Sequence, residues 1–572
     1  MGLTGSRRSS ARRGLWFLPL AGTLRTYPRN WLRSDVLAGI SVCIVMIPSV
    51  IAYAELAGLP PAHGLYAALA AMIGYALLAS SRQVIAGPDA ALTLLVAAAV
   101  GPLSGGDASK AATLAAVMAL LCGALMLLAA VIKLGAVAEL LSRPVLVGYL
   151  TGAALILVST QLGKLFGIAT REYDFLPLVA EIVRRLCETH VLTFAFGMAL
   201  TGLLAVLQRF APRFPGALVV FAIALILSVL FSLESHGVRV IGNVPRGLPR
   251  FSEARVSLSE LQVLVPAAAG IVMLAFPEGI LLARAFGAKN RYEIRPTQEL
   301  IALAVANLAA GLFQGFPSGA SQSRTSICDA TGGRSQIVSL VAAGTLALFL
   351  LLLTPLLKFL PTVALASILI VAGVRLIELR EYRLLFRVAQ RDFWLAVAVA
   401  AGVLVVWVIP GIVIGVTISL IHVLVRLARP MDAVLRPVPG TGRFHDLGDD
   451  GEEQTVPGLI AYRFYAPLFF ANAEHFVRRV RELIAASPDP VRWIVVDMQA
   501  VWDIDVTAAD ACARVVEELR QAGIFVAIAR ANRPLRERLQ RIGLYEKLGE
   551  PAYYPSVHAA IEEFERRKTD AH

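Results

Sequence analysis

Runs of apolar side chains fill residues 34–430 and alternate with short polar loops. A helix needs about 20 predominantly apolar residues to cross the hydrocarbon of a bilayer. Runs of that length or slightly shorter predict an all-α polytopic membrane domain of fourteen segments, in two sets of seven. The segments lie at 36–57, 63–80, 88–101, 111–133, 144–166, 191–208, 216–233, 263–285, 298–316, 318–330, 336–358, 362–377, 392–409 and 411–428.

The pattern changes after Arg429. Residues 438–456 are polar and acidic, and strands then alternate with helices. We expect strands at 458–465, 493–498 and 524–529, helices at 472–486, 506–521 and 532–542, and a last helix that ends in FERRK. This alternation is typical of a small α/β domain. We therefore expect a basic tail over 1–33, a membrane domain over 34–430 and a soluble domain over 438–572.

Composition agrees with a membrane protein. Of the 572 residues, 57% are hydrophobic and 16% charged, which is too apolar for a soluble chain of this length. The net charge of +12 does not indicate nucleic-acid binding, because the basic residues lie mainly at the ends of apolar segments. Residues 1–33 contain seven Arg and no acid, so both ends of an even-numbered bundle are expected in the cytoplasm; the four Arg of loop 234–262 are an exception.

The five cysteines are scattered, without the paired spacing of a disulfide framework or a zinc site. We therefore expect no metal and no redox role.

The two halves of the membrane domain resemble each other. An offset of 229 residues places Pro48 on Pro277 and Pro88 on Pro317. Seven crossings separate the copies, so they must run in opposite directions through the membrane, as inverted repeats do. The alternative is chance, because Pro and Gly recur often in membrane helices.

Segments 88–101 and 318–330 are too short to cross alone and are predicted half-helices that begin at Pro88 and Pro317. Two half-helix N-termini that meet near the midplane would direct free N–H groups and positive dipole ends at an anion. The residues that we expect at the anion are Ser49, Tyr53, Ala90, Ala91, Ser318, Gly319, Ala320, Ser321, Ser323 and Arg324. Helix capping is the alternative for Ser318, and extension of the side chain to a membrane interface is the alternative for Arg324.

Two carboxylates lie near these segments. Glu278 follows Pro277 inside an apolar run, and an ionisable group there indicates ion or proton handling. The alternatives are a partner for Arg284 or a carboxyl kept neutral by packing. Asp89 is expected to cap the first half-helix, with proton coupling as a second hypothesis.

Several segments together resemble the sulfate permease (SulP) family of anion transporters. They are AYAELAGLPPAHGLYAAL (52–69), RPVLVGYLTGAALI (143–156), PTQELIALAVANLAAGLFQGFPSGASQSRT (296–325) and TGGRSQI (331–337). The tail resembles the STAS domain that ends this family, most closely in DMQAVWDIDVTAADA (497–511). The resemblance runs from about Leu32 to the C-terminus.

The resemblance implies a UraA-like fold of two inverted seven-segment repeats, with an elevator-like exchange of the site, and a homodimer. Glu278 matches an acid linked to proton coupling, Ser323 and Arg324 match a pair that lines the anion site, and Tyr53 matches an aromatic residue there. Ser49 stands where many members have Gln, and Asp89 departs from the commoner neutral sequence.

In the STAS-like tail, Thr507 falls at the position of the hydroxyl that is phosphorylated in the related antagonist proteins. The tail is thus a possible site for a cytoplasmic partner.

We expect a non-enzymatic secondary transporter in the cytoplasmic membrane that takes up sulfate with protons, without a cofactor other than a coupling proton or sodium ion. Bicarbonate or a dicarboxylate is the alternative substrate. A permissive channel fits a buried carboxyl poorly. The competing class is a membrane-anchored regulator that acts through its STAS domain.

Overall fold

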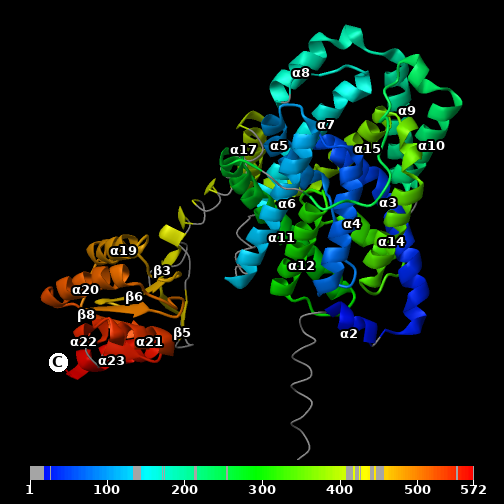
Figure 1. Ribbon diagram of the computed structural model, residues 1–572. Helices are drawn as coiled ribbons and strands as arrows, with labels where there is room; N and C mark the ends of the chain where they lie inside the picture. Colours follow the sequence, from blue (N-terminus) through cyan, green and yellow to red (C-terminus); the bar gives the residue numbers. More distant parts are fainter. Residues whose placement is uncertain are drawn as a thin grey trace, which may run out of the picture. The chain divides into compact units, whose positions relative to one another are not determined.

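We describe a computed structural model of the chain (Figure 1). It describes residues 19–570 except 26, 133–142, 171, 173, 212–214, 253–255, 407–416, 419–420, 422–423, 426, 439–442, 446–455 and 549–551. The chain forms two compact units, Met1–Ser419 and Leu420–His572. The first is almost entirely helical, and the second combines a sheet with helices.

The helices of the first unit follow the apolar runs. They are α2 (Pro19–Arg25), α3 (Leu32–Leu56), α4 (Pro61–Leu78), α5 (Ala90–Ser104), α6 (Ala108–Val131), α7 (Arg143–Phe166), α8 (Phe175–Arg184), α9 (Val191–Phe210), α10 (Gly216–Leu230), α11 (Leu258–Lys289), α12 (Pro296–Leu312), α13 (Gln322–Ala330), α14 (Ile337–Leu352), α15 (Thr362–Leu376), α16 (Leu379–Val388) and α17 (Gln390–Val406). Among the described residues, seven helical stretches are long and apolar enough to cross a membrane by length and composition. The fold is the predicted helical membrane domain. The predicted segment 411–428 lies mostly outside the described residues.

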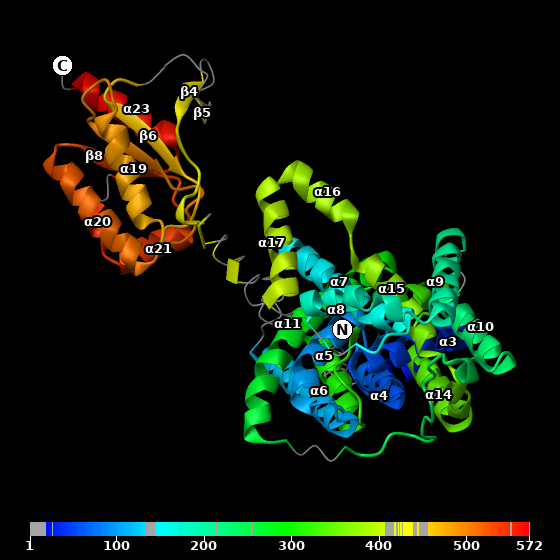
Figure 2. The same ribbon diagram turned by 90° about the horizontal axis from the view of Figure 1, so that it is seen from above.

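The helices form two groups. In the first group α12 packs on α4 and α6, α14 packs on α3, and α11 packs on α5 and α6. In the second group α7 packs on α15 and α17, and α15 packs on α9 (Figure 2). Small residues permit these close contacts, as is common between membrane helices. A Cβ atom at Gly148 of α7 would lie 2.3 Å from the main-chain oxygen of Ala396 in α17, which is closer than any real contact.

Two features of the first unit correct the sequence predictions. The half-helices begin at Ala90 and Gln322, not at Pro88 and Pro317, because the residues between are extended. Helices α8 and α16 lie in stretches read as loops, because each has 10 residues and is too short to count as a spanning segment.

The second unit has a five-stranded sheet in the order β3-β6-β7-β8-β9. The central strands are parallel, and β3 is antiparallel to β6. The strands are β3 (Asp432–Val434), β6 (Leu459–Phe464), β7 (Trp493–Asp497), β8 (Phe525–Ala529) and β9 (Tyr553–Tyr554), and β4 (Arg436–Val438) and β5 (Arg443–His445) form a separate hairpin.

Helices cover both faces of this sheet. Side chains of β6 and β7 alternate between the faces, so that Tyr462 and Val496 join one core while Ala461 and Val495 join the other. The first core is closed by α19 (Ala473–Ala485), α20 (Val506–Gln521), α21 (Arg533–Arg541) and α22 (Leu544–Leu548), and the second by α23 (Val557–Asp570). The unit is thus the α/β domain that the sequence predicts, with β3, β9 and α22 in addition.

Candidate functional site

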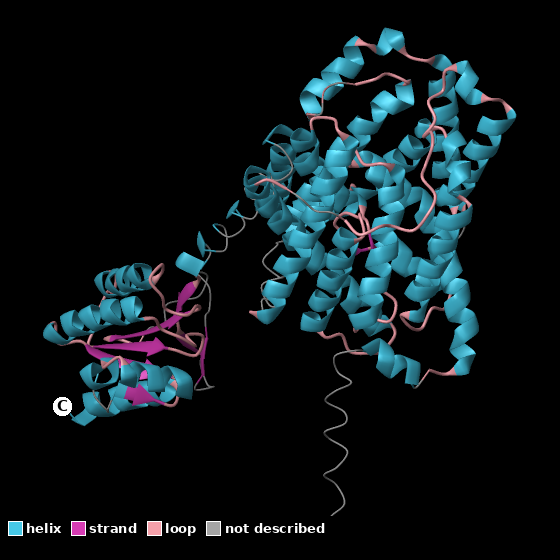
Figure 3. Cartoon of the chain, viewed as in Figure 1, coloured by secondary structure: helices cyan, strands magenta, loops and turns pink. Residues whose placement is uncertain are grey.

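Two very short strands pair in the middle of the helical unit. β1 (Ala86–Gly87) and β2 (Gly319–Ala320) are antiparallel, with Ala86 opposite Ala320 and Gly87 opposite Gly319. Figure 3 shows them as the short magenta segment among the helices. The Ser321 N–H extends the pairing by donating to the Ile85 carbonyl at 3.0 Å. Backbone polar groups inside a membrane protein must be satisfied internally, and this pairing satisfies part of both segments.

Both half-helices start directly after these strands. α5 begins at Ala90, where the Asp89 carboxylate accepts a hydrogen bond of 3.2 Å from the Ala91 N–H. The prediction that Asp89 caps this helix is therefore confirmed. α13 begins at Gln322, and the preceding Ser321 makes no capping bond with its side chain. The start of α13 thus keeps free N–H groups that a ligand could use.

Three side chains that the sequence reasoning missed hold the two strands in place. Asn307 of α12 is fully buried; its amide donates to the Ser318 carbonyl and accepts from the Ser318 N–H, both at 2.9 Å. Thr325 accepts from the Ile85 N–H at 3.1 Å. Gln336 donates to the carbonyls of Ser81 and Val84, both at 2.9 Å. The signal in the sequence was the residue type, because amide and hydroxyl side chains that become buried are almost always hydrogen-bonded.

Arg324 lies in the first turn of α13 and is only 3% exposed. Its Nη2 donates to the Pro88 carbonyl at 2.8 Å, which joins the two half-helix starts. The alternative that this side chain extends to a membrane interface is therefore wrong. Its Nε has no hydrogen-bond partner within the part of the chain that the structure describes. Tyr53 and Asp89 lie near its guanidinium.

Gly87 is required beside Arg324. A Cβ atom at this position would lie 3.2 Å from Nη2 of Arg324, and its φ of +156° is one that other residues rarely adopt. The guanidinium therefore packs flat against bare backbone.

The two predicted carboxylates lie near each other. Glu278 of α11 is half-buried, and Asp89 is close enough to repel its negative charge. Among the described residues Glu278 has no hydrogen bond or ion pair. Tyr149 of α7 lies near both carboxyls, and its hydroxyl donates to the Ala91 carbonyl at 3.0 Å. This bond links the two helix groups, and the sequence reasoning missed Tyr149.

The predicted serines differ in their surroundings. Ser318 is buried and its hydroxyl donates to the Phe316 carbonyl at 3.2 Å, so its side chain does not cap α13. Ser321 and Ser323 lie 3.3 Å apart through their hydroxyl oxygens, and Ser323 is exposed. Ser49, one turn before Tyr53 on α3, is half-buried. The structure thus brings together Tyr53, Asp89 and Arg324, with Ser321 and Ser323 in the same first turn.

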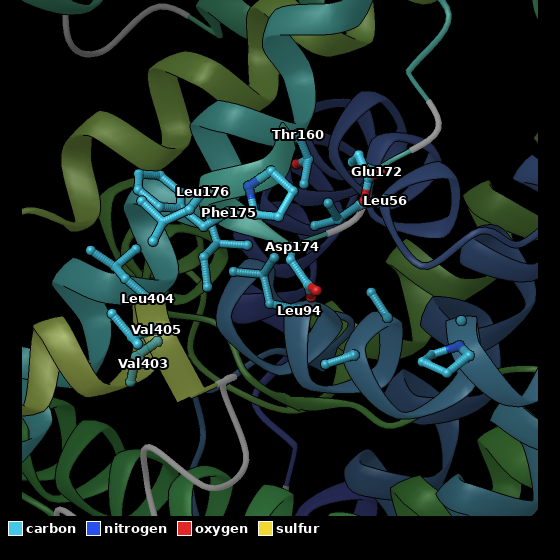
Figure 4. A pocket seen from close by; sticks show the side chains of 16 residues that line it. Leu56, Leu94, Thr160, Glu172, Asp174, Phe175, Leu176, Val403, Leu404 and Val405 are labelled. Atoms are coloured by element: carbon cyan, nitrogen blue, oxygen red, sulfur yellow. The ribbon is translucent and has the colours of Figure 1, made fainter. Parts of the chain in front are cut away.

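A separate cavity of about 510 Å³ lies beyond the C-terminal half of α5 (Figure 4). Leu56, Leu94, Ile156 and residues 403–405 line it with hydrocarbon, and Thr160, Glu172 and Asp174 supply its polar groups. Leu94 lies one helical turn after Ala90 on α5, so the cavity begins close to the N-terminus of this half-helix. None of the residues discussed above as anion ligands lines it.

In the second unit Thr507 is exposed in the first turn of α20. Asp505 caps this helix by accepting from the Ala508 N–H at 2.7 Å, and also accepts from the Phe470 N–H at 2.9 Å. The hydroxyl of Thr507 is therefore accessible to solvent, as modification would require.

Comparison with known proteins shows similarity over most of the chain. Residues 32–399 match the sulfate permease family, and residues 452–560 match the STAS domain. The chain is 41% identical over 543 residues to "Probable sulfate transporter MT1781" of Mycobacterium tuberculosis, covering 95% of this chain and 97% of that protein.

Two solved structures share the fold. The structure of SLC26A9 superposes with a TM-score of 0.90 at 21% identity, over 99% of this chain and 95% of that one. The transmembrane domain of the cyanobacterial bicarbonate transporter BicA superposes with a TM-score of 0.60 at 22% identity, over 69% of this chain and 97% of that one.

Proposed function

The chain belongs to the sulfate permease family, and on this basis we propose that it is a secondary active transporter that takes up a small anion, sulfate first, together with protons. It is a transporter and not an enzyme. The named function of the mycobacterial relative supports sulfate as the first substrate to test.

The observation that carries this proposal is the joint between the two half-helix starts. Two helix N-termini carry partial positive charge, and free N–H groups at such ends bind anions. Arg324 adds a full positive charge, buried and with an unused Nε donor. We propose that the anion binds in front of Arg324, with Ser321 and Ser323 as hydroxyl donors and Tyr53 as the opposite wall.

Asp89 modifies this site. Its carboxylate already holds the Ala91 N–H, so α5 begins with a negative charge of its own. An incoming anion must therefore compete with Asp89 for the field of Arg324. We propose that Ala90 and Ala91 contribute mainly through the helix dipole, while α13, whose N–H groups lack a side-chain cap, binds the anion directly.

Glu278 is proposed as the proton-coupling group. It lies inside a membrane helix, is half-buried, and is close to the second carboxyl of the site, Asp89. Two carboxylates near one another in low dielectric are held most easily with one proton between them. Binding of an anion beside them would favour that proton further, so that anion and proton load together. Sodium is the alternative coupling ion.

The two helix groups support an elevator-like exchange. The anion residues lie on α3 and α5 of the first group and on α13, which packs on α3, whereas α7, α15 and α17 belong to the second group. We propose that the first group moves the site past the second, which requires the Tyr149 to Ala91 hydrogen bond to break in each cycle.

We further propose a cytoplasmic-membrane location with both ends of the chain in the cytoplasm, a homodimer, and a cytoplasmic partner for the STAS domain near Thr507. Bicarbonate and dicarboxylates are the alternative substrates, and the fold shared with the bicarbonate transporter BicA favours testing the former. The competing class is a membrane-anchored STAS regulator.

The test is purified full-length protein in liposomes, offered labelled sulfate, bicarbonate, chloride and fumarate in turn. We expect saturable sulfate uptake that the other anions inhibit less well than sulfate itself. Preferred uptake of bicarbonate or fumarate would change the proposed substrate but leave the proposed anion site in place. No uptake of any anion by well-folded protein would favour the regulator.

A further inference from the structure

Helix α16 carries a row of three arginines on its surface. Arg380, Arg383 and Arg387 follow the i, i+3, i+7 spacing, which places them on one face of a helix. All three are exposed, and none has a hydrogen bond or ion pair among the described residues. The one acid of this helix, Glu381, is bonded instead to Arg143 of α7 at 2.7 Å. The row is therefore a surface with unneutralised positive charge.

The opposite side of α16 attaches it to the membrane unit. Leu385 is buried, and Tyr382 and Phe386 contact the ring of Phe393 in α17, with centroids 6.1 and 5.2 Å apart. A helical wheel places Leu385 and Tyr382 roughly opposite the arginine row, at 100° per residue. The arginines thus point away from the protein, and Figure 2 shows α16 at the margin of the unit, beyond α17.

Large apolar side chains flank the arginine row on both sides. Leu379 and Phe386 are 62% and 51% exposed, and Leu384 and Val388 are 45% and 76% exposed. Such exposure on a ten-residue helix is unfavourable in water but is expected of a helix that lies in a membrane interface, with basic residues at the headgroups and apolar ones in the acyl region.

Chain connectivity fixes α16 at that depth. The apolar helix α15 ends at Leu376 and α17 begins at Gln390. Only Ile377 and Glu378 join α15 to α16, and two extended residues reach at most about 7 Å. Because α15 and α17 coincide with the predicted membrane segments 362–377 and 392–409, α16 stays close to the membrane surface.

We propose that α16 is an in-plane helix that binds anionic phospholipid, with Arg380, Arg383 and Arg387 contacting the headgroup phosphates. Arginine suits this role because its guanidinium donates two parallel hydrogen bonds to phosphate. Each basic residue at an anionic surface gives roughly a fivefold preference for that lipid. The same charges could attract the acidic stretch DLGDDGEE (446–453) of the chain itself, and the test separates the two.

Trp394 offers a local measurement, because it is 64% exposed and its ring lies 5.3 Å from that of Phe393. Full-length protein is placed in phosphatidylcholine nanodiscs that contain brominated phosphatidylglycerol or, at the same mole fraction, brominated phosphatidylcholine. The Trp394→Phe variant gives the signal to subtract. We expect the brominated anionic lipid to quench Trp394 more strongly, with a local enrichment on the order of ten or more at low salt, declining as salt is added.

Three variants complete the test. Replacing Arg380, Arg383 and Arg387 by Gln should remove the excess quenching, whereas replacing all three by Lys should keep most of it. The matched control replaces Arg520, Arg536 and Arg541 of the second unit by Gln, which removes the same charge from exposed positions and should leave the excess unchanged. Equal quenching by the two lipids in the unmodified protein would overturn the proposal, and this is the outcome expected if the acidic stretch occupies the arginines. Excess quenching that survives in the Gln variant would also overturn it. Loss of the excess in the Lys variant or the control would also overturn it.

Discussion

The guanidinium of Arg324 donates to the main-chain carbonyl of Pro88 at 2.8 Å, and the two residues are 236 positions apart in the chain. This single bond joins the starts of the two half-helices. It also holds the guanidinium beside the antiparallel strands β1 and β2, so that any change in the spacing of α5 and α13 moves the charge.

The first prediction concerns this charge. Arg324→Gln should weaken sulfate binding by roughly 10- to 100-fold, since a hydrogen bond to a charged group contributes about 1.5–3 kcal/mol. Equilibrium binding of labelled sulfate to purified protein measures the change. Arg209→Gln, an exposed arginine on α9, is the control and should bind as the unmodified protein does. Equal affinity in both variants would remove Arg324 from the site.

Asp89→Asn should have the opposite effect. Asparagine caps helices as well as aspartate does, so the Ala91 N–H keeps its partner while the competing negative charge disappears. We expect sulfate to bind about three- to tenfold more tightly near neutral pH, consistent with a charge effect of about 1 kcal/mol. The same binding assay applies. Weaker binding would mean that Asp89 helps to hold the anion or its proton and does not compete with it.

Asn307→Leu should destabilise the first unit. The amide of Asn307 satisfies both main-chain groups of buried Ser318, and leucine leaves them unpaired at a cost of about 1–3 kcal/mol each. Thermal unfolding in detergent should shift down markedly, and residual folded protein should bind sulfate less well. Asn243→Leu, the same replacement at an exposed loop position without a side-chain hydrogen bond among the described residues, should shift the transition much less. An unchanged transition in Asn307→Leu would show that the two hydrogen bonds of Asn307 to Ser318 contribute little to stability.

Glu563 gives a pH prediction for the second unit. Hydrogen bonds from Arg566 and then Arg567 lower the pKa of the Glu563 carboxyl to about 2, from 4.5. A carboxyl whose pKa is lower in the folded state stabilises the fold fully above the unfolded pKa, and this contribution is lost as the pH falls toward 2. Arg567 also lies 5.3 Å over the ring of Trp493, so protonation should loosen α23 from the sheet.

Acid titration of the full chain, followed by tryptophan fluorescence, measures this effect. Glu563→Gln should flatten the part of the titration between about pH 4.5 and 2. Glu565→Gln lies on the same helix at an exposed position without a side-chain hydrogen bond among the described residues, and should leave the titration unchanged. Identical curves for both variants would contradict the role of Glu563.

The sequence predicted most of the helices and strands because their signals are local. Apolar runs fix α3, α6 and α7 within a few residues, and alternation with βα periodicity fixes β6, β7 and α20. Asp89 was predicted as a cap from its place before an apolar run, and the structure confirms it.

The parts that could not be predicted are non-local or too short to carry a pattern. Two-residue strands are too short to show a periodic pattern, so the pairing of Ala86 with Ala320 could not be predicted from the sequence of either segment. The start of α13 was misplaced because the repeat carried Pro88 onto Pro317. Gly319 and Ala320 form β2, so α13 starts three residues later than the same offset from Ala90 predicts. The residues near Arg324 in the chain do not indicate whether its side chain points inward or to a membrane interface. Its inward position depends on the hydrogen bond to the Pro88 carbonyl, which is distant in the sequence.

Proton coupling is tested most directly by labelled sulfate uptake into proteoliposomes with an imposed pH gradient, acidic outside. The unmodified protein should take up sulfate faster and to a higher level with the gradient than without it. Glu278→Gln should bind sulfate with nearly the same affinity but show uptake that no longer responds to the gradient. Uptake by Glu278→Gln that is accelerated by the gradient as strongly as in the unmodified protein would contradict the proposed coupling.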